Sequence, residues 1–189
     1  MRSQRIKYLT QEEQRALLRT LRDHRSAERD YCLFNLILNT GLRLAEVLAL
    51  NVCDVRDRTV LRVVGKGDKM REIPLNKAIR GHLEEFLRWK RRQDEGLSDL
   101  DPLFVSRNNG RVTSRPVQRA LTKWLRLAGV EGHYSPHSLR HTFATQVYER
   151  TKNIRLVQDV LGHQNIGTTM IYTHVTKQEI AEAVELLTA

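Results

Sequence analysis

One short stretch differs from the rest of the chain in its pattern of apolar residues. Residues 59–75 read TVLRVVGKGDKMREIPL, two β-rich runs on either side of the turn GKGDK. Runs of this kind around a glycine-containing turn predict an antiparallel hairpin, here with Lys66 at its tip and Pro74 at its end. The segments on both sides have helical periodicity. We therefore expect an α+β, mainly α-helical fold with one small antiparallel β-sheet.

Local start and stop signals delimit the predicted helices. Thr10 with Glu13 forms a capping box for a helix that runs to about Arg22. A second helix begins near Ala27 and ends at Gly41, because glycine readily adopts the left-handed conformation that closes a helix. Further helices are predicted over about residues 42–50, 76–94, 114–129, 135–151, 153–161, 168–172 and 176–188. On the buried faces we expect Leu33, Phe34, Ile37, Leu38, Leu44, Val47, Leu48, Ile79, Leu83, Phe86, Leu87, Leu139, Phe143 and Val147.

Composition favours an intracellular protein with a compact core. Of the 189 residues, 40% are hydrophobic and 29% charged, an ordinary balance for a folded domain. The longest apolar run, YCLFNLIL, is far shorter than a membrane span requires, and the N-terminus has no apolar signal segment. Cys32 and Cys53 both lie among apolar neighbours, where reduced core thiols are expected. We expect a cytoplasmic protein with no membrane partner.

The positive charge is unevenly distributed. The net charge is +10, yet residues 137–189 hold five acidic and five basic residues, so all the excess lies upstream. No acid occurs between Pro102 and Val130, and Arg115, Arg119 and Lys123 recur every four residues there. On a helix these three form one basic stripe, whose mutual repulsion a polyanion would relieve. A solvated helix face is the alternative interpretation; we favour contacts to DNA phosphates.

The stretch PHSLRHTFAT, residues 136–145, carries the first candidate site. Pro136 predicts a helix start, so His137 and Arg140 lie on one face near its N-terminus. Free backbone N–H groups, the helix dipole and the guanidinium fork make that end suitable for a phosphate. Taken alone, the pair could also be structural. A metal site at His137 and His141 is less favoured, because the glutamate of a zinc-peptidase helix is missing between them.

Three other stretches favour a functional interpretation of the His137–Arg140 pair. TGLRLAE contains Arg43 and Glu46, GKGDK contains Lys66, and LGHQNIGTTMIYTH contains His163 and Tyr172. Each motif alone is weak. In this order, from about Thr10 through Tyr172, the chain resembles the tyrosine recombinases of the phage-integrase family, which use Arg, Lys, His-x-x-Arg, His or Trp, and a nucleophilic Tyr.

The resemblance implies a role for each of these residues. Tyr172 would attack a DNA phosphodiester and form a 3′-phosphotyrosine, while Lys66 would protonate the leaving 5′-oxygen. Lys69 is the rival for this role on the same hairpin. The arginines Arg43 and Arg140 would clamp the phosphate oxygens.

The remaining site residues would act on protons or on position. His137 would be the general base, His163 would hydrogen-bond the phosphate, and Glu46 would orient the cluster. No metal and no nucleotide cofactor is required. His141, His174, Tyr134 and Tyr148 are expected to serve packing or hydrogen bonding instead.

The resemblance also bears on domains and partners. Family members carry an N-terminal helical domain that grips DNA, whereas here the motifs begin at Arg43. We therefore expect residues 1–189 to be a catalytic domain with the N-terminal core-binding domain absent, either as part of a larger enzyme or as a single-domain enzyme like the fimbrial-switch invertases. The implied partners are double-stranded DNA with an inverted-repeat site and further copies of the chain, dimer to tetramer. The helix at about 176–188 would dock on a neighbouring subunit or pack back against its own subunit.

Two other functions fit the same motifs. A type IB topoisomerase-like enzyme would form the same 3′-phosphotyrosine and reseal the same strand. A DNA-binding regulator would keep the fold without catalysis. Because every motif residue is present, we favour the recombinase.

Overall fold

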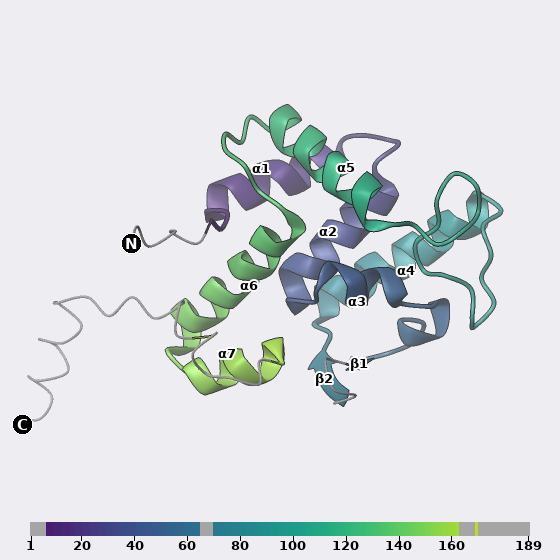
Figure 1. The fold of residues 1–189 in the computed structure, drawn as a ribbon. Helices are drawn as coiled ribbons and strands as arrows, with labels where there is room; N and C mark the ends of the chain where they lie inside the picture. The colour runs from purple at the N-terminus through teal and green to yellow at the C-terminus, as the bar shows by residue number, and fades with distance from the viewer. Residues whose placement is uncertain (1–6, 65–69, 163–168, 170–189) are drawn as a thin grey trace, which may run out of the picture.

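The computed structural model describes residues 7–64, 70–162 and 169. Seven α-helices, one 3-10 helix and two strands lie in this part of the chain (Figure 1). In chain order they are α1 (Gln11–Arg22), α2 (Glu28–Thr40), α3 (Leu44–Ala49), the 3-10 helix η1 (Val52–Asp54), β1 (Val60–Val64), β2 (Met70–Pro74), α4 (Lys77–Arg92), α5 (Ser114–Leu127), α6 (Pro136–Thr151) and α7 (Ile154–Leu161). The predicted fold class, mainly helical with a small antiparallel sheet, is confirmed.

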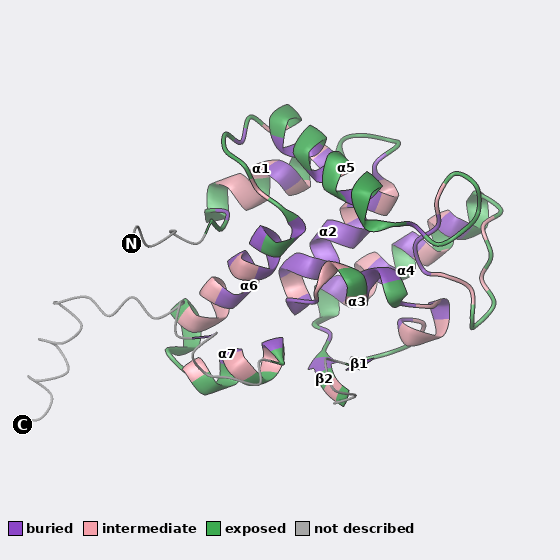
Figure 2. Cartoon of the chain, in the orientation of Figure 1, coloured by how far each residue is buried: buried purple, intermediate pink, exposed green. Residues whose placement is uncertain are grey.

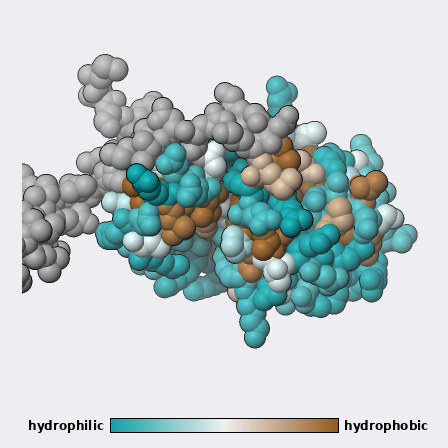
Figure 3. Space-filling model, turned by 90° about the horizontal axis from the view of Figure 1, so that it is seen from below, coloured by the Kyte–Doolittle hydropathy of each residue, from teal (hydrophilic) through white to brown (hydrophobic). Residues whose placement is uncertain are grey.

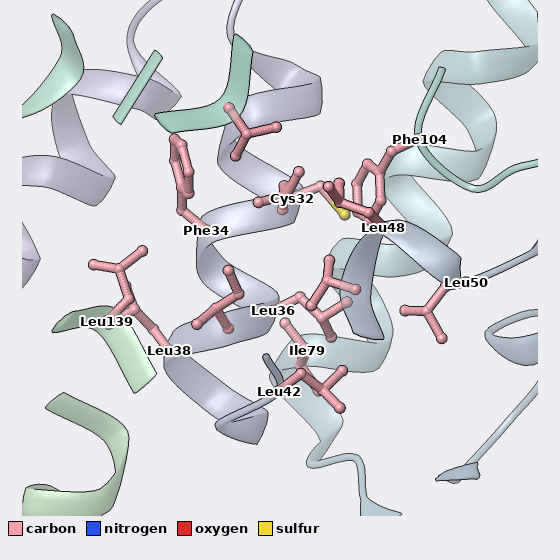
Figure 4. Packing of buried hydrophobic residues seen from close by; sticks show 14 of the residues in the cluster. Cys32, Phe34, Leu36, Leu38, Leu42, Leu48, Leu50, Ile79, Phe104 and Leu139 are labelled. Atoms are coloured by element: carbon pink, nitrogen blue, oxygen red, sulfur yellow. The ribbon is translucent and has the colours of Figure 1, made fainter. Parts of the chain in front are cut away.

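Helix α2 is the centre of the fold. It contacts α1, α3, α4, α5 and α6, and most of its residues are buried, as Figure 2 shows by its colour. In Figure 4 its apolar side chains point into the surrounding core, with Leu139 of α6 beside Leu38. A helix that is apolar around most of its circumference must be covered on all sides. The helices that carry the candidate site therefore pack on a common rigid core.

The predicted hairpin is present, and one of its faces is buried. Strands β1 and β2 are antiparallel, with Leu61 opposite Ile73 and Val63 opposite Arg71. Leu61, Val63 and Ile73 are buried, whereas Arg62 and Glu72 pair on the exposed face at 2.9 Å. Because alternate side chains point to opposite faces, Arg71 shares the inward face with the three apolar residues. The turn, with Lys66 and Lys69, lies outside the described residues.

The local signals predicted most helix ends correctly. The Thr10–Glu13 capping box is formed at both bonds, 2.7 and 3.2 Å, and Gly41 and Gly162 end their helices with φ of 63° and 64°. The predicted start of α5 at Ser114 is confirmed, with Thr113 before it as the N-cap. Apart from Thr169, the helices predicted at 168–172 and 176–188 fall outside the described residues.

A small second apolar cluster joins α6 to α7. Ala144, Val157 and Leu161 are buried in it, with Phe143 and Val147 packed alongside. Leu87, predicted on a buried face, is partly buried, as are Phe143 and Val147. From below, hydrophobic areas interrupt the hydrophilic surface of the molecule (Figure 3). Within the described part of the chain, no helix combines the length and apolar character that crossing a bilayer demands.

Candidate active site

The start of α6 presents two predicted site residues one turn apart. Pro136 occupies the first helical position, and the Ser138 hydroxyl accepts a hydrogen bond from the Ser135 backbone N–H at 3.1 Å. This fixes the first turn, from which His137 and Arg140 project on neighbouring positions. His137 is exposed, whereas Arg140 is only 1% exposed. The two residues therefore differ in how much solvent they lose when a ligand binds.

Arg140 is anchored by backbone carbonyls at the ends of two other helices. Its Nη1 donates to the carbonyl of Gly41, just past α2, and its Nη2 donates to the carbonyl of Leu161, the last residue of α7, at 2.7 Å. Both carbonyls lie at helix C-termini, where the helix dipole is negative and stabilises a buried cation. Arg140 thus ties three helices together while lining the pocket described below.

Arg43 is held by a carboxylate that it shares with a second arginine. It is the N-cap of α3; its backbone N–H donates to Oε2 of Glu46 at 2.7 Å and its Nη1 to Oε1 at 2.8 Å. Arg71 of β2 donates to the same oxygens, Nη1 to Oε1 at 3.0 Å and Nη2 to Oε2 at 2.7 Å. Glu46 therefore contacts Arg43 in the way that its predicted orienting role requires. Arg71 also belongs to this cluster, and the sequence analysis missed it.

The electrostatic state of Glu46 follows from these neighbours. Burial by itself raises the pKa of its carboxyl, but the hydrogen bonds and charges of Arg71 and Arg43 outweigh burial and leave the pKa below its ordinary value. Glu46 is therefore ionised at neutral pH. Two arginines share one negative charge, which leaves the cluster net positive.

A pocket of about 230 Å³ opens between α3, α5 and the start of α6. Its lining is Arg43, Leu44, Gln118, Ser135, Pro136, His137 and Arg140. The structure thus brings Arg43 together with His137 and Arg140, which lie almost a hundred positions further along the chain. Gln118 of α5 is a further polar lining residue that the sequence analysis did not single out.

The pocket keeps His137 neutral. Desolvation by the surrounding protein lowers the pKa of its imidazole, and the positive charges of Arg140 and Arg43 lower it further. A neutral imidazole can accept a proton, as a general base must. The His141 ring packs edge-on against His137 with the ring centroids 4.3 Å apart. No group of three His, Cys, Asp or Glu side chains that could hold a metal occurs among the described residues.

Three predicted site residues, Lys66, His163 and Tyr172, lie outside the described residues. The hairpin that carries Lys66 is anchored next to the pocket through Arg71 and Glu46. His163 directly follows Gly162, which ends α7 beside the Leu161 carbonyl held by Arg140. The catalytic roles of all the site residues stay predictions.

The predicted basic stripe lies on the exposed face of α5. Arg115, Arg119 and Lys123 are all exposed. Arg119 and Lys123 also line a groove of about 590 Å³, together with Arg29, Arg107 and Arg111, whereas Arg115 does not. The groove contains one acid, Asp30, which pairs with Arg29 at 2.9 Å and accepts a hydrogen bond from the Trp124 indole at 2.8 Å. This basic groove, defined by its five cationic residues, is a candidate surface for polyanions.

Comparisons with known proteins agree on the class. The fold matches a XerH site-specific recombinase bound to difH substrate with a TM-score of 0.82 and 28% identity, over 97% of this chain and 55% of that one. It also matches a XerA recombinase with a TM-score of 0.77 and 30% identity, over 95% and 64% of the two chains. At 20% identity, the catalytic domain of bacteriophage HP1 integrase shows the same fold, with a TM-score of 0.68 over 95% of this chain and 94% of that one. The fold is that of a tyrosine recombinase catalytic domain.

Sequence comparison places the chain within a family. The model of the phage integrase family matches residues 7–179, and the chain belongs to this family. A tyrosine recombinase XerC from Vibrio campbellii is 41% identical over 180 residues, 94% of this chain and 56% of the relative. One from Caldanaerobacter subterraneus is 42% identical over 179 residues, 94% of this chain and 50% of the relative. The chain therefore spans about half the length of the curated relatives it matches.

Proposed function

We propose that this chain cleaves and rejoins DNA strands at specific sites through a 3′-phosphotyrosyl intermediate. The observation that supports this most directly is the pocket in which Arg43, His137 and Arg140 converge at the N-terminus of α6. Membership of the phage integrase family supports Tyr172 as the proposed nucleophile, and the likeness to XerC and XerH recombinases supports site-specific recombination rather than another use of the same chemistry.

The proposed reaction conserves the phosphodiester bond energy. The phenolic oxygen of Tyr172 attacks the scissile phosphorus, His137 accepts the phenolic proton, and the bond from phosphorus to the 5′-oxygen breaks. Lys66 gives a proton to that leaving oxygen. A 5′-hydroxyl of a partner strand later attacks the phosphotyrosine and restores Tyr172. Neutral His137 is the form that this step requires, and its lowered pKa provides it.

The arginines stabilise the charge that develops on phosphorus. Arg43 and Arg140 are fixed before DNA binds, one by Glu46 and the other by two backbone carbonyls. Donors fixed in advance need no reorganisation during the reaction, and removal of one typically costs about 10²–10³ in rate. His163 would add a further hydrogen bond to the phosphate.

Double-stranded DNA is the proposed partner, with an inverted-repeat site and a dimer to tetramer of this chain assembled on it. The solved XerH relative is bound to its difH substrate. In this chain, the basic groove, which includes Arg119 and Lys123, would contact the DNA backbone on one side of the pocket, because α5 lines both the groove and the pocket. The proposed location is the cytoplasm, where such DNA is found.

Covalent trapping tests the function. Nicked DNA duplexes are incubated with the chain, and denaturant-resistant protein–DNA adducts are recovered and sequenced, with Tyr172→Phe as the control. Adducts that disappear in the control and share an inverted repeat support the proposal. Adducts without strand exchange, together with relaxation of supercoiled plasmid, would point to a topoisomerase. DNA binding without any adduct would point to a regulator.

A further inference from the structure

Arg71 makes a buried, two-pronged contact with Glu46. Its side chain is 10% exposed and that of Glu46 is 9% exposed. The two Nη groups of Arg71 bind the two carboxylate oxygens at 3.0 and 2.7 Å, one each. Such parallel bonds fix the direction of both groups, unlike a solvent-exposed ion pair. The carboxylate of Glu46 is therefore oriented by the guanidinium fork of Arg71 together with the backbone N–H of Arg43.

The guanidinium of Arg43 makes fewer hydrogen bonds to the Glu46 carboxylate than that of Arg71 does. It makes one bond, from Nη1 to Oε1 at 2.8 Å, and the Arg43 side chain is 38% exposed at the pocket. Within the described part of the chain, its Nη2 and Nε form no hydrogen bond. Because Arg71 occupies both oxygens, Glu46 holds Arg43 in place without engaging its whole fork. The remaining donors of Arg43 are the ones that a phosphate can use.

Arg71 also connects segments that the sequence keeps apart. A Cβ at Gly162 would lie 2.9 Å from Cδ of Arg71, so the stem of the arginine packs directly against the end of α7. Gly162 precedes His163 in the chain, and β2 directly follows the turn that carries Lys66. One side chain thus contacts α3, belongs to the hairpin and touches the residue before His163.

We propose that Arg71 is a positioning residue for strand cleavage: by occupying the Glu46 carboxylate, it keeps the fork of Arg43 available to the scissile phosphate. Without Arg71, both oxygens of Glu46 can accept the fork of Arg43, which would then be turned toward α3. A displacement of about 1 Å in a positioned group can cost about 10² in rate. The inference rests on the function proposed above.

The test uses the full chain and a DNA duplex that the chain itself selects. A pool of nicked duplexes with a randomised central sequence is incubated with the wild type, and the duplex enriched in covalent adducts becomes the substrate. Single-turnover cleavage and DNA affinity are then measured for Arg71→Gln and Arg71→Lys. The matched control is Arg62→Gln, which removes the exposed arginine paired with Glu72 on the same hairpin.

We expect Arg71→Gln to cleave about 10²-fold more slowly with unchanged DNA affinity. Arg71→Lys keeps the charge but not the fork, so it should not restore the rate, and Arg62→Gln should cleave like the wild type. In a Glu46→Gln background, Arg71→Gln should slow cleavage no further, because its effect acts through Glu46. If the losses of cleavage rate in Arg71→Gln and Glu46→Gln add in the double variant, Arg71 is a structural anchor and the proposal is overturned. If Arg71→Lys cleaves like the wild type, a simple charge effect explains the role of Arg71 and the proposal is overturned as well.

A second measurement separates this inference from the proposed function. Arginine side-chain ¹⁵N–¹H signals are recorded while inorganic phosphate is added to the wild type and to Arg71→Gln. The Arg43 signal should shift in the wild type and not in the variant. If the wild type forms no adduct but shows this difference, the proposed function fails while the positioning role of Arg71 stands. Equal shifts in both proteins would overturn the positioning role whatever the adduct assay shows.

Discussion

Replacement of Arg140 tests whether this residue holds the fold together as well as the phosphate. Arg140→Met keeps the length of the side chain and removes every donor. Gly41 and Leu161, whose carbonyls Arg140 binds, are themselves buried, so no solvent would replace the lost bonds. We expect the variant to be folded but clearly less stable, because two polar groups at helix ends lose their partner together.

The size of the effect follows from the two bonds. A hydrogen bond from a charged donor contributes about 1.5–3 kcal/mol, so the loss of two amounts to roughly 3–6 kcal/mol. Burying methionine in place of a cation recovers part of the desolvation cost, which puts the expected loss near the lower bound, about 3 kcal/mol. For a chain of this size, that corresponds to a Tm about 6–12 °C lower. Arg140→Lys can still reach one carbonyl and should lose about half as much.

Urea unfolding followed by tryptophan fluorescence measures these free energies, since Trp124 is buried in the core. Both variants should unfold in one transition with an unchanged dependence on urea. A stability of Arg140→Met within about 1 kcal/mol of the wild type would refute the structural role that the contacts indicate. A confirmed loss would mean that Arg140→Lys, and not the methionine variant, is the informative substitution for catalysis.

Three further predictions address other parts of the site. Gly41→Ala should destabilise the protein by about 2–5 kcal/mol in the same assay, because φ at Gly41 is 63° and the new Cβ would lie 2.4 Å from Cδ1 of Phe143. Gly81→Ala is the control: Gly81 lies in α4, a Cβ there would meet nothing within 4 Å, and the variant should be as stable as the wild type or more stable. Histidine NMR titration should place the pKa of His137 below its ordinary 6.5. The neutral, proton-accepting imidazole then predominates above pH 6.5. The contribution of His137 to the free energy of unfolding is complete above that pH and is lost as the pH falls through the lowered pKa. Arg43→Gln should raise that pKa, and an unchanged value would show that the Arg43 charge does not reach the ring. Finally, a protein with six to ten phosphate contacts loses about 10³–10⁵ in DNA affinity between 50 and 200 mM salt. Replacing Arg119 and Lys123 by Gln should reduce this salt dependence, whereas Arg126→Gln, on α5 but outside the basic groove, should have less effect, and equal effects would argue against the groove.

Short-range signals in the sequence predicted most of the fold. The Thr10–Glu13 capping box, the glycine after Thr40 and the proline at the start of α6 act within one turn of helix, so their effect can be read without knowing the tertiary structure. The hairpin was predictable for the same reason. The start of α5 at Ser114 was predictable in the same way, from Ser114 and Pro116 in its first turn.

The contacts that orient the site could not be predicted in this way. Arg71 reaches Glu46 across 25 positions of sequence, and Arg140 reaches Gly41 across 99. A clue to Arg71 was available: it shares the inward face of the hairpin with Ile73, and a charge at such a position requires a partner. Nothing in the sequence indicated that the partner would be Glu46, or that Arg140 would be almost completely buried.

The way each arginine is held explains why the pocket favours an anion. Glu46 neutralises one charge while it orients two arginines, Arg43 and Arg71. Arg140 is oriented by two backbone carbonyls, one at the end of α2 and one at the end of α7. Arg43 and Arg71 thus bring two positive charges to one carboxylate, which leaves their cluster net positive. Desolvation is the main cause of the lowered pKa of His137, and the charges of Arg140 and Arg43 lower it further. The arrangement that would bind a phosphate therefore also keeps the proposed base ready to accept a proton.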